Sequence, residues 1–121
     1  MAQILVVDDS STVRDEVATF LKNSGLDVST AVDGRDGLAK LKADPAIKLV
    51  VCDVNMPNMD GLTMVEKIRS ELRNTTVNLI MLTTGSSPSM KERGKAAGVK
   101  GWIVKPFKGA AVLETFKKLV A

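Results

Sequence analysis

The sequence contains no histidine and only one cysteine, Cys52. A zinc site of the usual nitrogen and sulfur ligands is therefore excluded, and so is a catalytic triad that depends on histidine. A single cysteine forms no disulfide within the chain. Because Cys52 ends an apolar stretch, we expect it to act as a small buried hydrophobic residue. The chemistry of this protein has to come from its carboxylate, hydroxyl and ammonium groups.

The chain also lacks a long apolar run. No stretch approaches the roughly 20 apolar residues that a membrane helix needs. The first residues, MAQILVVDD, have neither the basic region nor the small-residue cleavage site of a signal peptide. We therefore expect a cytoplasmic protein without membrane contact. A length of 121 residues, with 45% hydrophobic and 26% charged residues, fits one domain over residues 1–121 with a single core.

The net charge of +3 is unevenly distributed. Residues 1–83 hold nine basic and twelve acidic side chains, whereas residues 84–121 hold eight basic and two acidic ones. The basic segment is either a solvated face or a binding surface for an acidic partner. A nucleic-acid partner is not expected, because this segment has no recognition-helix motif and no interleaved aromatic residues.

Five short apolar stretches alternate with five amphipathic segments. The predicted strands are residues 4–7, 27–32, 49–52, 77–83 and 101–104, and the predicted helices are residues 11–24, 35–43, 61–73, 88–97 and 109–120. Continuously apolar strands need cover on both faces, and the half-alternating strand 27–32 is expected nearer an edge. The pattern predicts an α/β fold, a doubly wound five-stranded parallel sheet with helices on both faces.

Polar side chains gather where the predicted strands end. Asp8 and Asp9 follow the first strand, Asp53 the third, Thr83 ends the fourth, and Lys105 follows the fifth. Ligands of doubly wound sheets bind beyond the carboxyl ends of the strands. Three carboxylates so close together repel one another unless a cation joins them, and oxygen ligands alone suit Mg²⁺. A helix cap would explain Asp8 or Asp9 singly, but it does not explain the whole group.

Four motifs occur in order along the chain: ILVVDDSSTVR, CDVNMPNMDG, MLTTG and VKPF. In their order and spacing the chain resembles the response-regulator receiver domains over its whole length, and most closely the single-domain chemotaxis regulators among them. The resemblance implies the receiver fold, a flavodoxin-like sheet, in one receiver domain over residues 1–121 without an output domain. It also implies a two-component phosphoprotein that catalyses only its own phosphorylation and dephosphorylation, and is otherwise no enzyme.

The same resemblance implies a role for each acidic residue. Asp53 would be the phospho-acceptor, taking its phosphoryl group from a phosphohistidine on a partner kinase. Mg²⁺ would be bound by Asp9, Asp53 and the backbone carbonyl of Asn55, while Asp8 acts mainly through a metal-bound water.

Further residues would serve the switch. Lys105 would pair with the phosphoryl oxygens, and the Lys105–Pro106 bond is expected to be cis. Thr83 would hydrogen-bond the phosphoryl group, and Trp102 would then turn inward. Family members commonly carry tyrosine or phenylalanine at that position, so the larger indole is expected to change the amplitude of the switch. Gly85 stands where the chemotaxis regulators have an acidic residue, which predicts a different phosphoryl lifetime.

The output is expected on a basic face within residues 88–120. Lys91, Lys95 and Trp102 are its candidate contact residues, and Gly94 inside a thinly apolar helix suggests mobility. The expected partners of this monomer are a histidine kinase, a phosphatase and a target protein with an acidic segment, such as the flagellar motor switch.

Several other functions share part of this pattern. A phosphorelay intermediate, a phosphate sink and a pilus or cell-cycle regulator would share the fold and the site. A haloacid dehalogenase-type phosphohydrolase needs a second aspartate two residues after the nucleophile, where Asn55 shuttles no proton. A flavin carrier needs a phosphate-binding loop after the first strand, where Asp8 and Asp9 would repel a phosphate.

Overall fold

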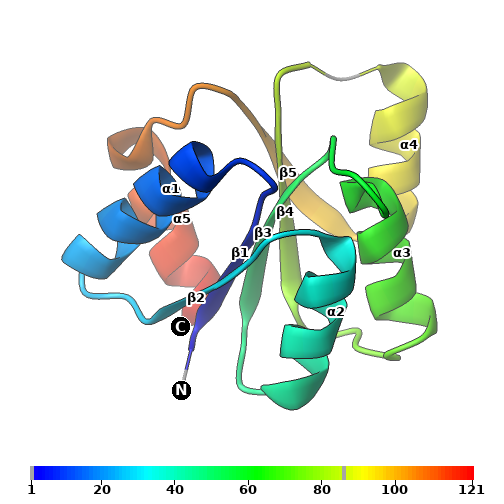
Figure 1. Cartoon of the computed structure of the whole chain (residues 1–121), viewed down its shortest axis with the longest axis horizontal. Coiled ribbons are helices and arrows are strands. Elements are labelled where there is room, and N and C mark those ends of the chain that lie inside the picture. Colours follow the sequence, from blue (N-terminus) through cyan, green and yellow to red (C-terminus); the bar gives the residue numbers. More distant parts are fainter. Residues whose placement is uncertain (1, 86) are drawn as a thin grey trace.

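The computed structural model describes residues 2–85 and 87–121 (Figure 1). The chain alternates strand and helix throughout. The elements are β1 (Ile4–Val7), α1 (Ser11–Asn23), β2 (Val28–Ala31), α2 (Gly34–Ala43), β3 (Leu49–Asp53), α3 (Gly61–Ser70), β4 (Asn78–Thr83), α4 (Pro88–Ala96), β5 (Val99–Val104) and α5 (Gly109–Val120). All strands are parallel, in the order β2-β1-β3-β4-β5. The predicted doubly wound sheet is confirmed.

The helices cover both faces of the sheet. Helices α1 and α5 lie on one face, and α2, α3 and α4 lie on the other (Figure 1). Successive strand residues point to opposite faces. In β1, Ile4 and Val6 therefore pack into the core under α1 and α5, whereas Leu5 and Val7 pack into the core under the other three helices. Burial on both sides explains why the central strands are continuously apolar.

The observed bounds differ from the predicted ones at a few ends. Strand β5 begins at Val99, two residues earlier than predicted, and α3 ends at Ser70, three residues earlier. Arg73, predicted as the last helical residue, has a left-handed φ of 53°. Strand β2 lies at one edge of the sheet, as its half-alternating pattern predicts. Within the described ranges, no helix has both the length and the apolar character to cross a membrane.

The prediction that the apolar strands are covered on both faces is wrong for β5, which has no fully buried residue among those described. It forms the other edge of the sheet, and its last residue, Val104, is 63% exposed. Helix α4, which covers it on one face, has Gly94 as its only fully buried residue among those described. An apolar sequence therefore does not distinguish a central strand from an edge strand whose cover is thin.

Four helices begin at a residue that caps them. The side chains of Ser10, Asp33, Asp60 and Ser87 each accept a hydrogen bond from the backbone N–H three residues later. Such caps satisfy N–H groups that lack partners in the first turn of a helix. Pro88 occupies the first turn of α4, where a missing backbone N–H breaks no hydrogen bond of the helix. The caps fix where each loop at the carboxyl edge of the sheet ends, and these loops carry the candidate site.

Candidate functional site

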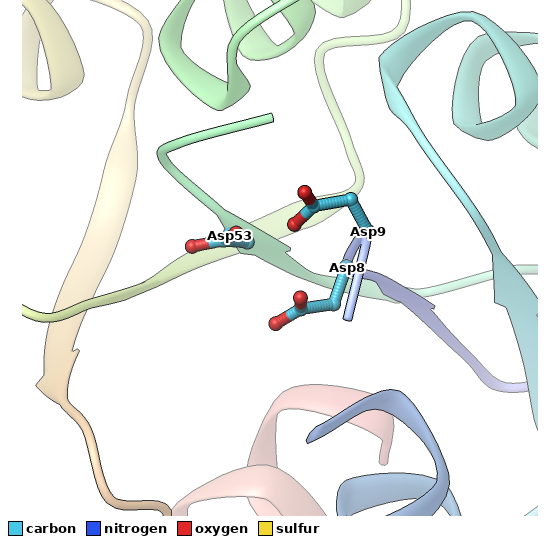
Figure 2. A group of neighbouring side chains, drawn as sticks. All are labelled: Asp8, Asp9 and Asp53. Atoms are coloured by element: carbon cyan, nitrogen blue, oxygen red, sulfur yellow. The ribbon is translucent and has the colours of Figure 1, made fainter. Parts of the chain in front are cut away.

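Two acidic residues lie side by side at the carboxyl edge of the sheet. Strands β1 and β3 pair so that Val7 is opposite Cys52. The next residues are Asp8, just after β1, and Asp53, the last residue of β3. Asp8 is fully buried and Asp53 is only 4% exposed. Figure 2 shows their carboxylates turned to the same side, with Asp9 beside them.

Lys105 reaches this pair from the far side of β4. Its Nζ lies 3.3 Å from Asp8 Oδ2 and 3.3 Å from Asp53 Oδ1. Its backbone N–H donates to the Thr83 carbonyl at 2.7 Å, which ties the segment after β5 to the end of β4. The Lys105–Pro106 peptide bond is cis, as the resemblance implies. One ammonium group therefore faces two buried carboxylates.

The surroundings shift the pKa values of this group. Burial, and then the Asp8 carboxylate, raise the pKa of Asp53 to about 6, although Lys105 and the backbone of Asn55 act in the opposite direction. Burial lowers the pKa of Lys105, but the carboxylates of Asp8 and Asp53 outweigh that effect and raise it overall. Lys105 is thus charged at neutral pH, and Asp53 is mostly charged although its site opposes ionisation.

The acidic group has the composition of a site for a hard cation. One carboxylate oxygen from each of Asp8, Asp9 and Asp53 lies within 4.8 Å of the other two. Asp8 Oδ2 is buried and, within the part of the chain that the structure describes, accepts no hydrogen bond. Asp9 is exposed and opens the group to solvent. The Lys105 ammonium is the ion-pair partner of this oxygen. An oxygen-only donor set with a buried oxygen that accepts no hydrogen bond fits Mg²⁺, which keeps several of its waters.

The loop between β1 and α1 is held by several hydrogen bonds. The Ser10 N–H donates to Asp8 Oδ1 at 2.9 Å, and Arg14 Nη1 donates to the Asp8 carbonyl at 2.7 Å. Ser10 itself caps α1 by accepting from the Val13 N–H. Capping of this helix by Asp8 or Asp9, weighed from the sequence, is therefore wrong. The carboxylates of Asp8 and Asp9 do not cap α1 and belong to the acidic group.

The loop after β3 packs directly against Asp53. A Cβ atom at Gly61 would lie 2.1 Å from the Asp53 carbonyl oxygen, so only glycine fits at this position. The Gly61 N–H donates to the Val54 carbonyl at 2.8 Å, and Asp60 caps α3. Asn55 lies exposed in the same loop. The Asp60–Gly61 pair thus forms the turn before α3 and also brings α3 against β3.

Thr83 ends β4 with a fully buried side chain. Its hydroxyl donates to the Gly85 carbonyl and accepts from the Gly85 N–H at 3.2 Å. In this state its hydrogen bonds are therefore made within its own loop.

The remaining predicted residues lie outside the acidic group. Trp102 is half-buried on β5, and its indole lies across Gly94 of α4. A Cβ at Gly94 would be 2.7 Å from Trp102 Cζ2, so the missing side chain makes room for the indole. Lys91 and Lys95 are exposed on α4.

Comparison with known proteins identifies the family. Residues 4–117 match the sequence model of the response regulator receiver domain. The chain belongs to the response regulator receiver domain family. It is 39% identical over 114 residues to the chemotaxis protein CheY of Treponema pallidum, covering 93% of this chain and 78% of the relative. It is 41% identical over 106 residues to the chemotaxis protein CheY1 of Helicobacter pylori, covering 87% and 86%.

Solved structures of other response regulators have the same fold as this receiver domain. The chemotaxis protein CheY4 of Vibrio cholerae has a TM-score of 0.89 and 40% identity, with 98% of each chain covered. The response regulator protein TrrA of Thermotoga maritima, in complex with Mg²⁺-BeF, has a TM-score of 0.83 and 30% identity, with 98% of this chain and 99% of that chain covered. CheY-like receiver domains are signalling regulators and not classical enzymes, so neither the phosphohydrolase nor the flavin carrier is supported.

Two residues near the acids were not found from the sequence of this receiver domain. Arg14 and Gly61 stand in the motifs ILVVDDSSTVR and CDVNMPNMDG, but the motifs assign them no role. Each contacts a backbone carbonyl oxygen of another segment, that of Asp8 or of Asp53. The periodicity of a sequence does not predict such contacts. The available signal is that each lies in the first turn of the helix that follows an acid at a strand end.

Proposed function

We propose that this receiver domain is a phospho-switch in chemotaxis. A histidine kinase donates a phosphoryl group to Asp53, and the phosphorylated form binds a downstream target through the face within residues 88–120. The observation that carries the proposal is the buried Asp53 carboxylate, placed within 3.3 Å of Lys105 and beside Asp8 and Asp9. Support for the pathway comes from the relatives at about 40% identity, which are chemotaxis proteins.

The chemistry follows from the charges of the site. With a pKa of about 6, Asp53 is predominantly ionised at pH 7, and its carboxylate oxygen attacks the phosphorus atom. The bond from phosphorus to the kinase histidine breaks, and the nitrogen leaves with the electron pair. Lys105 stays protonated and neutralises the negative oxygens of the transferred group.

Asp8, Asp9, Asp53 and the Asn55 backbone carbonyl would hold Mg²⁺, in keeping with the donor set described above. When bound, the ion supplies further positive charge to the phosphoryl oxygens. Asp8 has the fixed orientation that such a site needs, because Ser10 holds one of its carboxylate oxygens.

The switch would begin at Thr83. Its hydroxyl leaves the Gly85 carbonyl and hydrogen-bonds a phosphoryl oxygen on Asp53. Because Thr83 and Trp102 lie on neighbouring strands, β4 and β5, the movement makes space toward which the indole turns. The face that carries Lys91, Lys95 and Trp102 then fits a target with an acidic, partly apolar segment. A coupling of about 1–3 kcal/mol between the two sites would change target affinity by roughly 5–150-fold.

The acceptor assignment is tested by intact-mass measurement after treatment with acetyl phosphate or phosphoramidate and Mg²⁺. Wild-type protein should gain one phosphoryl group, and Asp53→Asn, which keeps the shape but removes the nucleophile, should gain none. Asp60→Asn is the matched control, because asparagine preserves the cap of α3. Equal phosphorylation of the Asp53 variant and the wild type would refute the assignment.

A further inference from the structure

Arg14 makes an unusual contact for a surface helix residue. It lies half-buried near the start of α1, and its Nη1 donates to the Asp8 carbonyl oxygen at 2.7 Å. Among the described residues, its guanidinium pairs with no carboxylate. The guanidinium is therefore directed at a backbone oxygen of the acidic group.

This contact fixes a peptide plane. The Asp8 carbonyl and the Asp9 N–H belong to the same planar unit, so holding the oxygen also sets the direction in which Asp9 leaves the chain. Asp8 is held on its other side, because its N–H donates to the Ala31 carbonyl at 3.2 Å and its Oδ1 accepts from Ser10. Three hydrogen bonds therefore hold Asp8, through its N–H, its carbonyl oxygen and its Oδ1.

The Asp9 side chain has no comparable restraint of its own. Its side chain is exposed, and in residues 2–85 and 87–121 its carboxylate accepts no hydrogen bond. Yet one of its oxygens lies within 4.8 Å of oxygens from Asp8 and Asp53. Its position therefore follows from the two peptide planes that flank it: the Ser10 N–H, which belongs to the Asp9–Ser10 plane, donates to Asp8 Oδ1, and Arg14 holds the Asp8–Asp9 plane.

We propose that Arg14 is a positioning residue for the cation site: by holding the Asp8–Asp9 peptide plane, it directs the Asp9 carboxylate toward Asp8 and Asp53. The inference rests on the proposed function, because it assumes that these carboxylates bind Mg²⁺. Arg14 touches neither the ion nor the phosphoryl group and acts through the backbone.

Charge and position make opposite predictions for the loss of Arg14. If its positive charge were its only effect, removing it would strengthen Mg²⁺ binding, because a repulsive charge near the cation would disappear. If it positions Asp9, removing it weakens binding. Residues that orient metal ligands typically change metal affinity by 10–100-fold when mutated, and the lower end applies to an effect transmitted through one peptide unit.

The experiment is calorimetric titration of the full chain with Mg²⁺ alone. Arg14→Met keeps the apolar stem and should bind about 10-fold more weakly than wild type. Arg14→Lys should recover part of this loss, because an ammonium group donates one hydrogen bond to the same oxygen. Arg35→Met is the matched control. Arg35 is an exposed residue near the start of α2, so this change removes the same charge from the same part of the next helix along the chain and should leave affinity unchanged.

A second readout follows the peptide plane itself. The ¹⁵N–¹H signal of the Asp9 amide should shift in Arg14→Met without Mg²⁺ and return toward the wild-type position in Arg14→Lys. If circular dichroism shows that Arg14→Met does not fold, the neutral, polar Arg14→Gln takes its place in the same comparison.

The outcomes distinguish the positioning role of Arg14 from the proposed function. Equal or tighter Mg²⁺ binding by the neutral variant overturns the positioning role and leaves the proposed function standing. Failure of the wild type to bind Mg²⁺ overturns both.

Discussion

The buried charge of Asp53 makes a prediction about stability without any ligand. Replacing Asp53 by asparagine removes a carboxylate that is 4% exposed and lies beside Asp8, while Lys105 keeps Asp8 as a partner. We expect Asp53→Asn to unfold at higher urea concentration than the wild type at pH 7. A residue placed for reactivity would then be a residue that weakens the resting fold.

The magnitude follows from the pKa. The pKa of Asp53 rises from 3.8 to about 6 in the folded protein, a difference of about two pH units and therefore at most about 3 kcal/mol. Below about pH 4 both states hold the proton and there is no penalty. Between about pH 4 and pH 6 the unfolded chain ionises first, so the free energy of unfolding falls as pH rises. Above about pH 6 the loss is complete.

The assay is urea unfolding at several values between pH 4 and pH 8, followed by far-ultraviolet circular dichroism with chelator present. The variant should exceed the wild type by up to about 3 kcal/mol at pH 7, and the difference should shrink toward pH 4. Asp15→Asn is the control, because Asp15 is exposed on α1 and its replacement should change stability by less than about 0.5 kcal/mol. Mg²⁺ at ten times its Kd should restore about 1.4 kcal/mol to the wild type and less to the variant.

Two results would refute this reasoning. One is an Asp53→Asn variant that is no more stable than the wild type at pH 7. The other is a stability difference that stays constant down to pH 4, because then the titration of Asp53 is not its source.

Two other features of the structure give direct expectations. Gly61→Ala, whose Cβ would lie 2.1 Å from the Asp53 carbonyl oxygen, should lower the free energy of unfolding by at least about 1–3 kcal/mol and slow phosphorylation by phosphoramidate, whereas Gly85→Ala, with open space at its Cβ, should stay within about 0.5 kcal/mol in the same urea measurement. Lys91→Glu combined with Lys95→Glu should weaken binding of the phosphorylated protein to an acidic target in pull-down at low salt, while the intact mass still shows phosphorylation of Asp53; undiminished binding would place the output elsewhere.

The fold was predictable because its signals are local and repeated. Apolar runs of four to seven residues, separated by amphipathic segments, define five strands and five helices wherever burial is continuous. The predictions were weakest at ends and edges. The limits of α3 and β5 depend on contacts between segments, and the half-exposed state of β5 depends on how little of α4 packs onto it.

The acidic group was predictable for a topological reason. The carboxyl ends of parallel strands meet at one edge, so residues far apart in sequence are brought together once the strands are assigned. The roles of Arg14, Gly61 and Gly94 were not predictable in this way. Each depends on the distance between its atoms and the backbone or side chain of another segment, and neither composition nor periodicity carries that information.

Helix α4 connects the candidate site to the basic face, and it is held unevenly. Near its C-terminal end, Arg69 Nε donates to the Ala97 carbonyl at 2.7 Å, and the buried Gly94 packs against Trp102. Near its N-terminal end, the Ser87 cap and the half-buried Met90 are the main attachments among the described residues.

This asymmetry bears on how the proposed movement of Thr83 would reach the proposed output face. The Thr83–Gly85 hydrogen bonds lie in the loop that leads into the less firmly held end of α4. The ion pair from Arg93 to α3 is exposed, so it opposes movement by no more than about 1 kcal/mol. If α4 pivots about its C-terminal end, it would carry Lys91 and Lys95 with it. The indole of Trp102, which packs against Gly94, would move with the helix. A useful switch requires a coupling energy of about 1–3 kcal/mol. This energy is comparable to the free energy of the contacts that such a pivot would break.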